Sequence, residues 1–274
     1  MVEILVTGRR SDGSWRALAN PGRKLGPGEV CVFEGSLDVE FVQRYGDGSW
    51  SVHFPGCDDP ESAFQELGRA PLPPYLRRPR GPDERILADR SRYQTVFASV
   101  PGSIAAPTAG LHFTAVVLRA LADRGVATTC LTLHVGEGTF RPVEADDPAD
   151  HVMHTEHFEV PPAVTEAVRA ARGRGGRVVA CGTTVARVLE DRAGKDGVPE
   201  AGVGETDIFL RPGHRFRGLD ALLTNFHLPR STLLMLVASL VGRERALDVY
   251  RVALERGYRF YSYGDASLFF GPPS

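Results

Sequence analysis

The pattern of hydrophobic and polar positions divides the 274-residue chain into two parts. Residues 1–56 contain short runs of β-branched and aromatic residues that Gly, Pro, Asp and Ser interrupt. Such runs predict β-strands at Val2–Thr7, Trp15–Ala19, Glu29–Phe33, Leu37–Arg44 and Trp50–Phe54. Strands at this spacing favour a small β-barrel or sandwich. Ser11–Trp15 resembles Gly46–Trp50, and two similar Asp-Gly hairpin turns explain this better than an internal repeat does.

From residue 93 onward the pattern changes to alternating helix and strand. Apolar positions with a 3.6-residue period, together with glycine stops or hydroxyl caps, predict helices at Thr114–Arg124, Ala163–Arg172, Val185–Arg192, Ser231–Val241 and Arg243–Arg256. Strands are expected at Thr128–Val135, Arg177–Cys181 and Tyr258–Tyr263. This alternation predicts an α/β fold: a three-layer α/β catalytic domain over residues 93–274, with a smaller N-terminal β-barrel domain over 1–56. Residues 57–92, rich in Pro and Arg, are interpreted as a connector.

Composition and charge are those of an ordinary globular protein, with 42% hydrophobic residues, 24% charged residues and a net charge of −2. Any RNA contact would therefore depend on local basic patches such as the arginines that follow PLPPY (71–75), although a solvated linker also explains them. The four cysteines form no CxxC pair, which favours reduced thiols. The chain start lacks a signal-peptide pattern, and no apolar run could span a bilayer, so we expect a cytoplasmic enzyme with no membrane contact.

The clearest candidate site lies where a predicted buried strand ends at Cys181 and runs through Gly182, Thr183 and Thr184 into a helix. Ligands of α/β sheets bind at the carboxyl ends of strands, and a helix N-terminus can hold anions or ribose oxygens. A helix cap without a ligand is the alternative. Neither GxGxxG nor GxxxxGK[ST] occurs, so the common nucleotide-binding motifs do not apply.

Three further segments carry polar side chains suited to a site. PGSIAAPTAGLHF (101–113) places small residues and His112 before a helix, which suits a loop over a ligand, although a lone His is more often structural. His151, His154 and His157 are three residues apart, with Glu156 among them, but this is not the HExxH zinc spacing and we expect no metal. Asn225 and His227 alternate about Phe226, and Tyr263 and Asp265 alternate likewise, so each pair would share one side of an extended segment.

Together these segments resemble the S-adenosylmethionine:tRNA ribosyltransferase-isomerase family of queuosine biosynthesis. The matching motifs are PLPPY (71–75), RYQTVFA (92–98), PGSIAAPTAGLHF (101–113), TLHVGEGTF-PV (132–143), H-MHTE (151–156), GRVVACGTT (176–184), ETDIFL-PG (205–213), TNFHLP-STLLMLV (224–237) and RFYSYGDA (259–266). They occur in the order of the family and span essentially residues 1–270. The resemblance implies a β-barrel domain attached to an α/β domain, in agreement with the pattern.

The resemblance also implies the chemistry. The ribosyl moiety of S-adenosylmethionine, a co-substrate, would move to 7-aminomethyl-7-deazaguanine in the tRNA anticodon, giving epoxyqueuosine, adenine and methionine, with no metal. We expect the donor to be bound by Thr108, Gly110, His112, Gly182, Thr183 and Thr184. Acid–base and ribose contacts are expected from His154, Glu156, His227, Tyr263 and Asp265. Arg77, Arg78 and Arg92 are candidates for contacts with the tRNA anticodon loop.

The chain departs from the family at three points. It lacks a usual opening segment with Asn-Asn-Thr-Arg, so we expect an incomplete barrel whose first strand is an edge, in a monomer or an edge-paired homodimer. Val185-Ala186 stands where the family has Ser-Val, and His214 replaces an aromatic residue. The alternatives are a related transferase acting on a small deazapurine or nucleoside, a metal hydrolase built on the three histidines, and a non-catalytic RNA-binding module.

Overall fold

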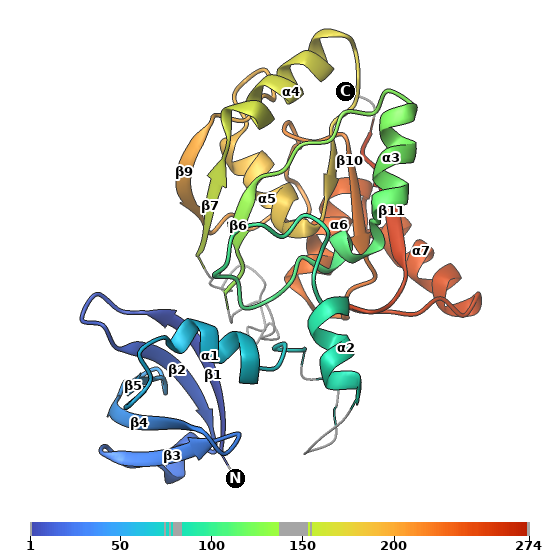
Figure 1. Cartoon of the computed structure of the whole chain (residues 1–274). Coiled ribbons are helices and arrows are strands. Elements are labelled where there is room, and N and C mark those ends of the chain that lie inside the picture. The colour runs from blue at the N-terminus through green and yellow to red at the C-terminus, as the bar shows by residue number, and fades with distance from the viewer. Residues whose placement is uncertain are drawn as a thin grey trace. The chain divides into compact units, whose positions relative to one another are not determined.

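Two units make up the chain in a computed structural model, which describes residues 2–73, 75–76, 78, 84–136, 153 and 155–272 (Figure 1). The first unit is Met1–Pro71 with Arg78–Arg90, and the second is Leu72–Arg77 with Ser91–Ser274. The residues interpreted as a connector contain two helices, α1 (Pro60–Leu67) and α2 (Glu84–Arg92). Asp59 caps α1 because its carboxylate accepts the backbone N–H of Ser62 at 3.2 Å.

A five-stranded antiparallel sheet in the order β1-β2-β5-β4-β3 forms most of the first unit. All five predicted strands are confirmed to within two residues, as β1 (Glu3–Arg9), β2 (Trp15–Asn20), β3 (Glu29–Phe33), β4 (Leu37–Arg44) and β5 (Trp50–His53). A short 3₁₀ helix, η1 (Gly22–Lys24), follows β2. The core lies on one face of the sheet, where Phe41 and Trp50 are essentially buried. Phe64 of α1 covers part of it by packing edge-on against Trp15, with ring centroids 5.1 Å apart.

The sheet is curled and open along the part of the chain that the structure describes. Register shifts between Val6 and Gly8 and between Phe41 and Gln43 mark bulges, which increase local twist. Strands β1 and β3 are its two edges, so β1 is an edge strand as predicted. Association through that edge stays a prediction.

The two similar Asp-Gly segments are two similar turns, as the sequence suggested. Asp12 accepts the backbone N–H of Ser14 at 2.9 Å and its hydroxyl at 2.7 Å, between β1 and β2. Asp47 accepts the same two groups of Ser49 at the same distances, between β4 and β5. Each aspartate therefore replaces missing backbone hydrogen bonds in a tight turn.

The second unit contains six described strands in two sheets. The orders are β11-β10-β8 and β6-β7-β9, with β6 (Thr132–His134), β7 (Glu156–Val160), β8 (Val179–Cys181), β9 (Gly202–Thr206), β10 (Ala221–Asn225) and β11 (Ala266–Phe270). Strands β8 and β10 are parallel, and the other pairs are antiparallel. The mixed α/β fold is confirmed, whereas the three-layer arrangement stays a prediction.

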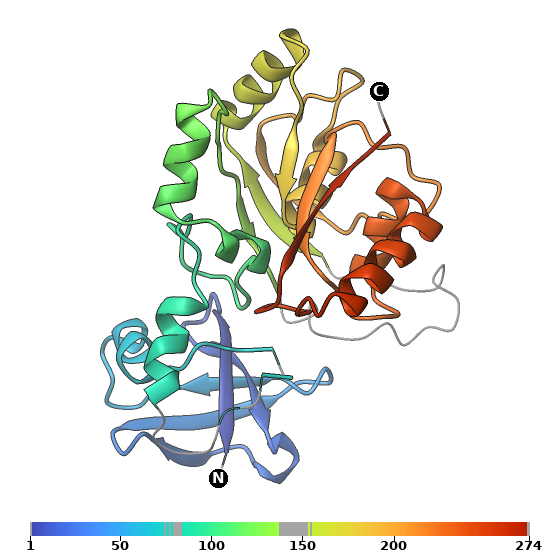
Figure 2. The same cartoon turned by 90° about the vertical axis from the view of Figure 1, so that its right-hand side faces the viewer.

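The five predicted helices are confirmed to within two residues at each end. They are α3 (Ala115–Asp123), α4 (Pro162–Gly173), α5 (Thr183–Arg192), α6 (Thr232–Val241) and α7 (Arg243–Glu255). A 3₁₀ turn that was not predicted, η2 (Thr108–His112), precedes α3. Helix α5 contacts β8, β9 and β10, and α6 packs against α7 and β11 (Figure 2). Leu222 of β10, Val188 of α5 and Val237 of α6 are fully buried in the shared core. Within the described residues, no helix has the length and apolar content needed to cross a membrane.

One predicted strand, Tyr258–Tyr263, is wrong. This segment is a loop, and the strand, β11, follows it. Tyr261 has a φ of 72°, which interrupts extended backbone. The loop closes because the backbone N–H of Asp265 donates to the carbonyl of Arg259 at 2.7 Å, and the N–H of Arg259 donates to the carboxylate of Asp265 at 2.7 Å. The predicted strand at residues 128–135 is confirmed only over Thr132–His134.

We expect Gly264→Ala to lower the free energy of unfolding by about 1–3 kcal/mol. A Cβ at this position would lie 2.4 Å from the carbonyl oxygen of Arg259 and 2.5 Å from the backbone of Phe260, so the loop must open. Urea unfolding of the variant and the parent measures this difference in the free energy of unfolding. The control is Gly173→Ala at the end of α4, where a Cβ meets nothing within 4 Å, so stability should stay equal or rise by up to about 1 kcal/mol. Equal stabilities for the two variants would contradict the packing argument.

Candidate active site

The parallel pair β8 and β10 brings two polar segments to one edge of a sheet. The backbone N–H of Gly182, just past β8, donates to the carbonyl of Leu223 in β10 at 2.9 Å. Gly182 has a φ of 95°, a left-handed conformation that glycine adopts readily. Helix α5 starts at the next residue and has no side-chain cap hydrogen bond. The predicted strand–turn–helix is therefore present, and the first N–H groups of α5 are available to a polar ligand.

The loop that was predicted to cover the ligand lies beside this turn. A Cβ on Gly182 would lie 3.8 Å from the Cβ of Ala109, and η2 contacts β10. Gly110 has a packing role, because its Cβ would lie 2.9 Å from the Cγ2 of Thr95. Thr108 and His112 of η2 are therefore held near the carboxyl edge of β8 and β10, as the sequence suggested.

Asn225 connects these elements through both ends of its amide. Its Nδ2 lies 3.1 Å from Nε2 of His112, and its Oδ1 lies 3.1 Å from Oγ1 of Thr108. In this amide orientation Nδ2 donates, so His112 accepts at Nε2 and carries its proton on Nδ1. Burial lowers the pKa of His112, although the charge of nearby Asp265 opposes that shift. His112 is therefore a neutral imidazole at neutral pH.

His227 is also held in a polar environment within the fold. Its Nε2 lies 2.9 Å from the hydroxyl of Thr224, and its backbone N–H donates to the hydroxyl of Tyr250 at 2.9 Å. Burial lowers the pKa of His227 from 6.5 to about 4. Between Asn225 and His227, Phe226 is buried and stacks on Phe260 with centroids 4.9 Å apart.

Tyr263 and Asp265 lie in the loop that closes on Arg259. The ring of Tyr263 packs edge-on against Tyr93, with centroids 5.8 Å apart. Asp265 is oriented by the N–H of Arg259 and lies close enough to His112 to affect its pKa. The loop thus brings two predicted catalytic residues toward the segments that surround Asn225.

Glu156, at the start of β7, is buried against Arg187 of α5, with Oε2 and Nη1 2.5 Å apart. Arg187 also donates to the carbonyl oxygens of Ile208 at 3.1 Å and Thr206 at 3.3 Å. Sequence reasoning missed Arg187. Its only sequence signal is an arginine within the helix that follows Gly182.

The histidine cluster is only partly described. His151 and His154 lie outside the described residues. His157 is exposed and pairs with Glu205 at 3.1 Å. Among the described side chains, no group of three or more His, Cys, Asp or Glu could hold a metal ion. The expectation of no metal stays a prediction.

The arginine candidates for RNA binding have different environments. Arg77 lies outside the described residues. Arg78 makes two hydrogen bonds to the buried carboxylate of Asp89 in α2, at 2.6 and 2.9 Å, so an internal ion pair explains it without RNA. Arg92 is exposed at the end of α2.

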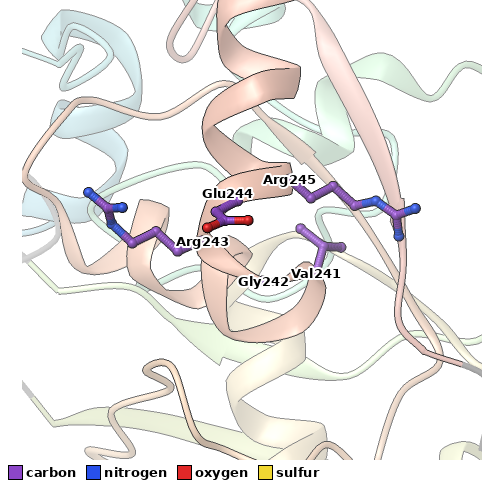
Figure 3. A pocket seen from close by; sticks show the side chains of 5 residues that line it. All are labelled: Val241, Gly242, Arg243, Glu244 and Arg245. Carbon is purple, nitrogen blue, oxygen red and sulfur yellow. The ribbon is translucent and has the colours of Figure 1, made fainter.

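A separate hollow of about 490 Å³ lies where α6 meets α7. It is lined by Val241, Gly242, Arg243, Glu244 and Arg245. The guanidinium groups of Arg243 and Arg245 point to opposite sides of the helix start in Figure 3. They do not converge on one ligand, so we assign no function to the hollow.

Comparison with known proteins agrees with the motif pattern. The family model described as queuosine biosynthesis protein matches residues 1–269. The chain belongs to this family.

Relatives in the queuosine biosynthesis family are close in sequence. A protein of Gloeobacter violaceus named S-adenosylmethionine:tRNA ribosyltransferase-isomerase is 48% identical over 97% of this chain and 74% of its own length. Proteins of the same name from Erythrobacter litoralis and Acidiphilium cryptum are 49% and 51% identical, over 93% and 94% of this chain and 72% and 75% of their own lengths. A crystal structure of S-adenosylmethionine tRNA ribosyltransferase from Thermotoga maritima is 34% identical, with a TM-score of 0.48, and the match covers 97% of this chain and 74% of that one.

We expect the neutral state of His227 to make stability depend on pH. The pKa of His227 is about 4 in the folded protein, and its ordinary value is 6.5. The stability that the neutral ring contributes is therefore fully present above pH 6.5 and is lost as pH falls toward 4. The loss is at most about 1.4 kcal/mol per pH unit. Urea unfolding between pH 7 and 4.5 should show a shallower decline for His227→Gln than for the parent. The exposed His53→Gln is the control, and an equal slope for His227→Gln and the parent would exclude this account.

Proposed function

We propose that the chain transfers the ribosyl moiety of S-adenosylmethionine to the aminomethyl group of 7-aminomethyl-7-deazaguanine in tRNA and isomerises it to epoxyqueuosine, releasing adenine and methionine. The name of the relatives supports this assignment. The observation that carries it is the Asn225 amide, which joins Thr108 and His112 beside Gly182 at one sheet edge. The reaction would take place in the cytoplasm, without a metal.

The donor, in this proposal, lies against the start of α5 and η2. The uncapped N–H groups of α5 favour the carboxylate of the donor's methionine part or its ribose oxygens, because a helix N-terminus carries partial positive charge. Thr183 and Thr184 offer hydroxyls there, and Gly182 offers backbone without a side chain. Gly110 supports the donor loop through its close packing on Thr95.

The reaction sets requirements that this chain's groups can meet. The sulfonium acidifies the adjacent C5′ protons, so a base must remove one, and adenine needs a proton donor to leave. His112 and His227 are neutral, because burial lowers the pKa of each, and Asp265 lies near His112. We assign proton transfer to His227, Asp265 and Tyr263, with His154 as a further candidate.

Glu156 has a different part in the proposal. Its buried carboxylate accepts a hydrogen bond from Arg187, and this contact fixes α5 against β7. Glu156 thereby positions the helix whose N-terminus would meet the donor. The proposed reaction also needs surroundings that favour the neutral, attacking form of the acceptor amine and exclude water from reactive intermediates.

The tRNA anticodon loop is the proposed macromolecular partner. The net charge of −2 offers no general attraction to RNA, so binding would rest on local cations such as Arg92, and on Arg77. Arg78 would act indirectly, by holding α2 through Asp89.

The first test measures the products. The protein is incubated with S-adenosylmethionine and one of three acceptors: tRNA carrying 7-aminomethyl-7-deazaguanine, the same tRNA without the modification, or the free deazapurine. We expect equimolar adenine and methionine by mass spectrometry only with the modified tRNA, at a rate that a chelator leaves unchanged. Turnover with the free base alone would favour the small-molecule transferase, zinc-dependent turnover would favour the hydrolase, and no turnover with any acceptor would refute the assignment.

The second test concerns the donor site. Thr183→Val and Thr184→Val keep nearly the same volume and delete one hydroxyl each. We expect at least one of them to raise the Kd for S-adenosylmethionine roughly two- to tenfold by calorimetry, the value of one neutral hydrogen bond. Gly182→Val is unsuitable, because the φ of 95° would strain a β-branched residue.

The matched control is Thr232→Val, since Thr232 is the first residue of α6 as Thr183 is of α5. It should bind the donor as the parent does. Parent-like affinity in both Thr183→Val and Thr184→Val would place the donor elsewhere.

A further inference from the structure

Tyr93 carries a buried hydroxyl that makes no hydrogen bond to any residue the structure describes. The residue is 5% exposed, and among the described residues its hydroxyl has no hydrogen-bond partner. Buried polar groups are almost always paired, because burial removes their bonds to water. A tyrosine that served only as packing could be a phenylalanine here. A buried hydroxyl that no described residue pairs with is free to serve a partner that binds from outside the chain.

The surroundings of Tyr93 are aromatic. Tyr263 meets its ring edge-on at 5.8 Å and 72°. Nearby, the rings of Tyr75 and Tyr261 lie 5.1 Å apart, and the hydroxyl of Tyr75 is fixed by Ser262, which donates its backbone N–H at 2.8 Å. Aromatic side chains favour a flat heterocycle over a sugar or an aliphatic chain, because each ring offers a face or an edge for stacking.

Tyr93 also belongs to the candidate active site by its place in the fold. Two residues later, Thr95 packs directly on Gly110 of η2, where a Cβ would lie 2.9 Å from its Cγ2. On the other side, Tyr263 precedes Asp265 by two residues, and Asp265 acts on His112. Tyr93 is therefore connected to the donor loop and to the proton-transfer loop.

The protonation state of Tyr93 decides what it can do. Burial raises its pKa above the ordinary value, and the proximity of Tyr75 and Tyr263 raises it further. The phenol is neutral at any physiological pH and has a proton to donate. It is therefore a hydrogen-bond donor and not a general base.

We propose that Tyr93 binds the base of a substrate, by donating its hydroxyl proton to a ring nitrogen or carbonyl oxygen of a planar purine-type heterocycle. The heterocycle is either the adenine of S-adenosylmethionine or the 7-deazaguanine of the acceptor. Both have such acceptors and both suit an aromatic subsite. This inference rests on the proposed function and adds to it a residue for base recognition.

The test is Tyr93→Phe, which removes only the oxygen atom. Because that oxygen has no partner among the described residues, the urea midpoint should stay equal or rise. Binding should weaken roughly three- to tenfold for one substrate, the value of one neutral hydrogen bond. A higher Kd for S-adenosylmethionine alone, by calorimetry, identifies adenine. An unchanged donor Kd with a raised KM for modified tRNA identifies the deazaguanine.

Tyr258→Phe is the matched control, because Tyr258 lies in the same unit and is largely exposed. It should leave the Kd for S-adenosylmethionine, the KM for modified tRNA and the urea midpoint unchanged. A Tyr93→Phe variant with parent-like donor Kd and parent-like KM for tRNA would overturn the proposal, and so would a clear loss of stability without a change in binding. The parent protein is assayed first for adenine release. If the parent is active and Tyr93→Phe binds both substrates as the parent does, only the role of Tyr93 is refuted. If the parent itself is inactive, the proposed function is refuted.

Discussion

Arg187 connects three parts of the second unit at once. From the middle of α5 it donates to the carboxylate of Glu156 at the start of β7 and to carbonyl oxygens of Thr206 and Ile208. Helix α5 also contacts β8 and β10, so it touches strands of both sheets. The direction of α5 determines where its N-terminus lies, and that N-terminus follows Gly182 at the sheet edge beside η2. The buried ion pair is thus the constraint on which the placement of the site depends.

A buried ion pair is a costly way to join two elements, because both charges lose their hydration. Its advantage is geometric. A guanidinium presents several N–H groups in one plane, and here three acceptors from different places in the chain engage them. Apolar contacts alone allow a helix to slide along a sheet, whereas directional bonds to fixed oxygens do not. Precision at the start of α5 is what a site for a reactive sulfonium donor requires.

Much of the fold could be predicted from the sequence, since local signals were strong. The five strands of the first unit lie between turns with Asp-Gly, Gly-Pro or Glu-Gly, and the helices have clear caps such as Thr114 and Ser231. Strands β9 and β10 were not predicted. Strand β9, GVGET, has almost no apolar residues, and the residues around β10 show no alternation of apolar and polar positions that would indicate a strand. The loop that ends at Asp265 looked like a strand because its aromatic residues alternate, yet the positive φ of Tyr261 interrupts the extended backbone and the loop packs closely around Gly264.

The residues of the candidate site could be predicted from the sequence, but the hydrogen bonds between them could not. Gly182 and His112 were recognisable from their local context. The contact between His112 and Asn225 spans 113 residues of sequence, and that between Glu156 and Arg187 spans 31, so no local pattern reports either. Tyr93 was passed over for the same reason, since a tyrosine with an unused hydroxyl looks in sequence like any core aromatic. Tertiary packing alone distinguishes it.

The amide of Asn225 has a consequence for how protons are held. The hydroxyl of Thr108 can either donate or accept, so it satisfies the amide in both of its orientations. In one orientation the amide nitrogen faces His112 and requires the imidazole proton on Nδ1; after a half-turn the amide oxygen faces His112 and requires the proton on Nε2. Rotation about a single side-chain bond therefore reverses which tautomer of the ring is favoured while every partner stays in place, and the ring exchanges its proton with solvent to follow. Because Asn225 faces Nε2 in both orientations, its amide determines whether the other ring nitrogen of His112, Nδ1, carries a proton or a lone pair.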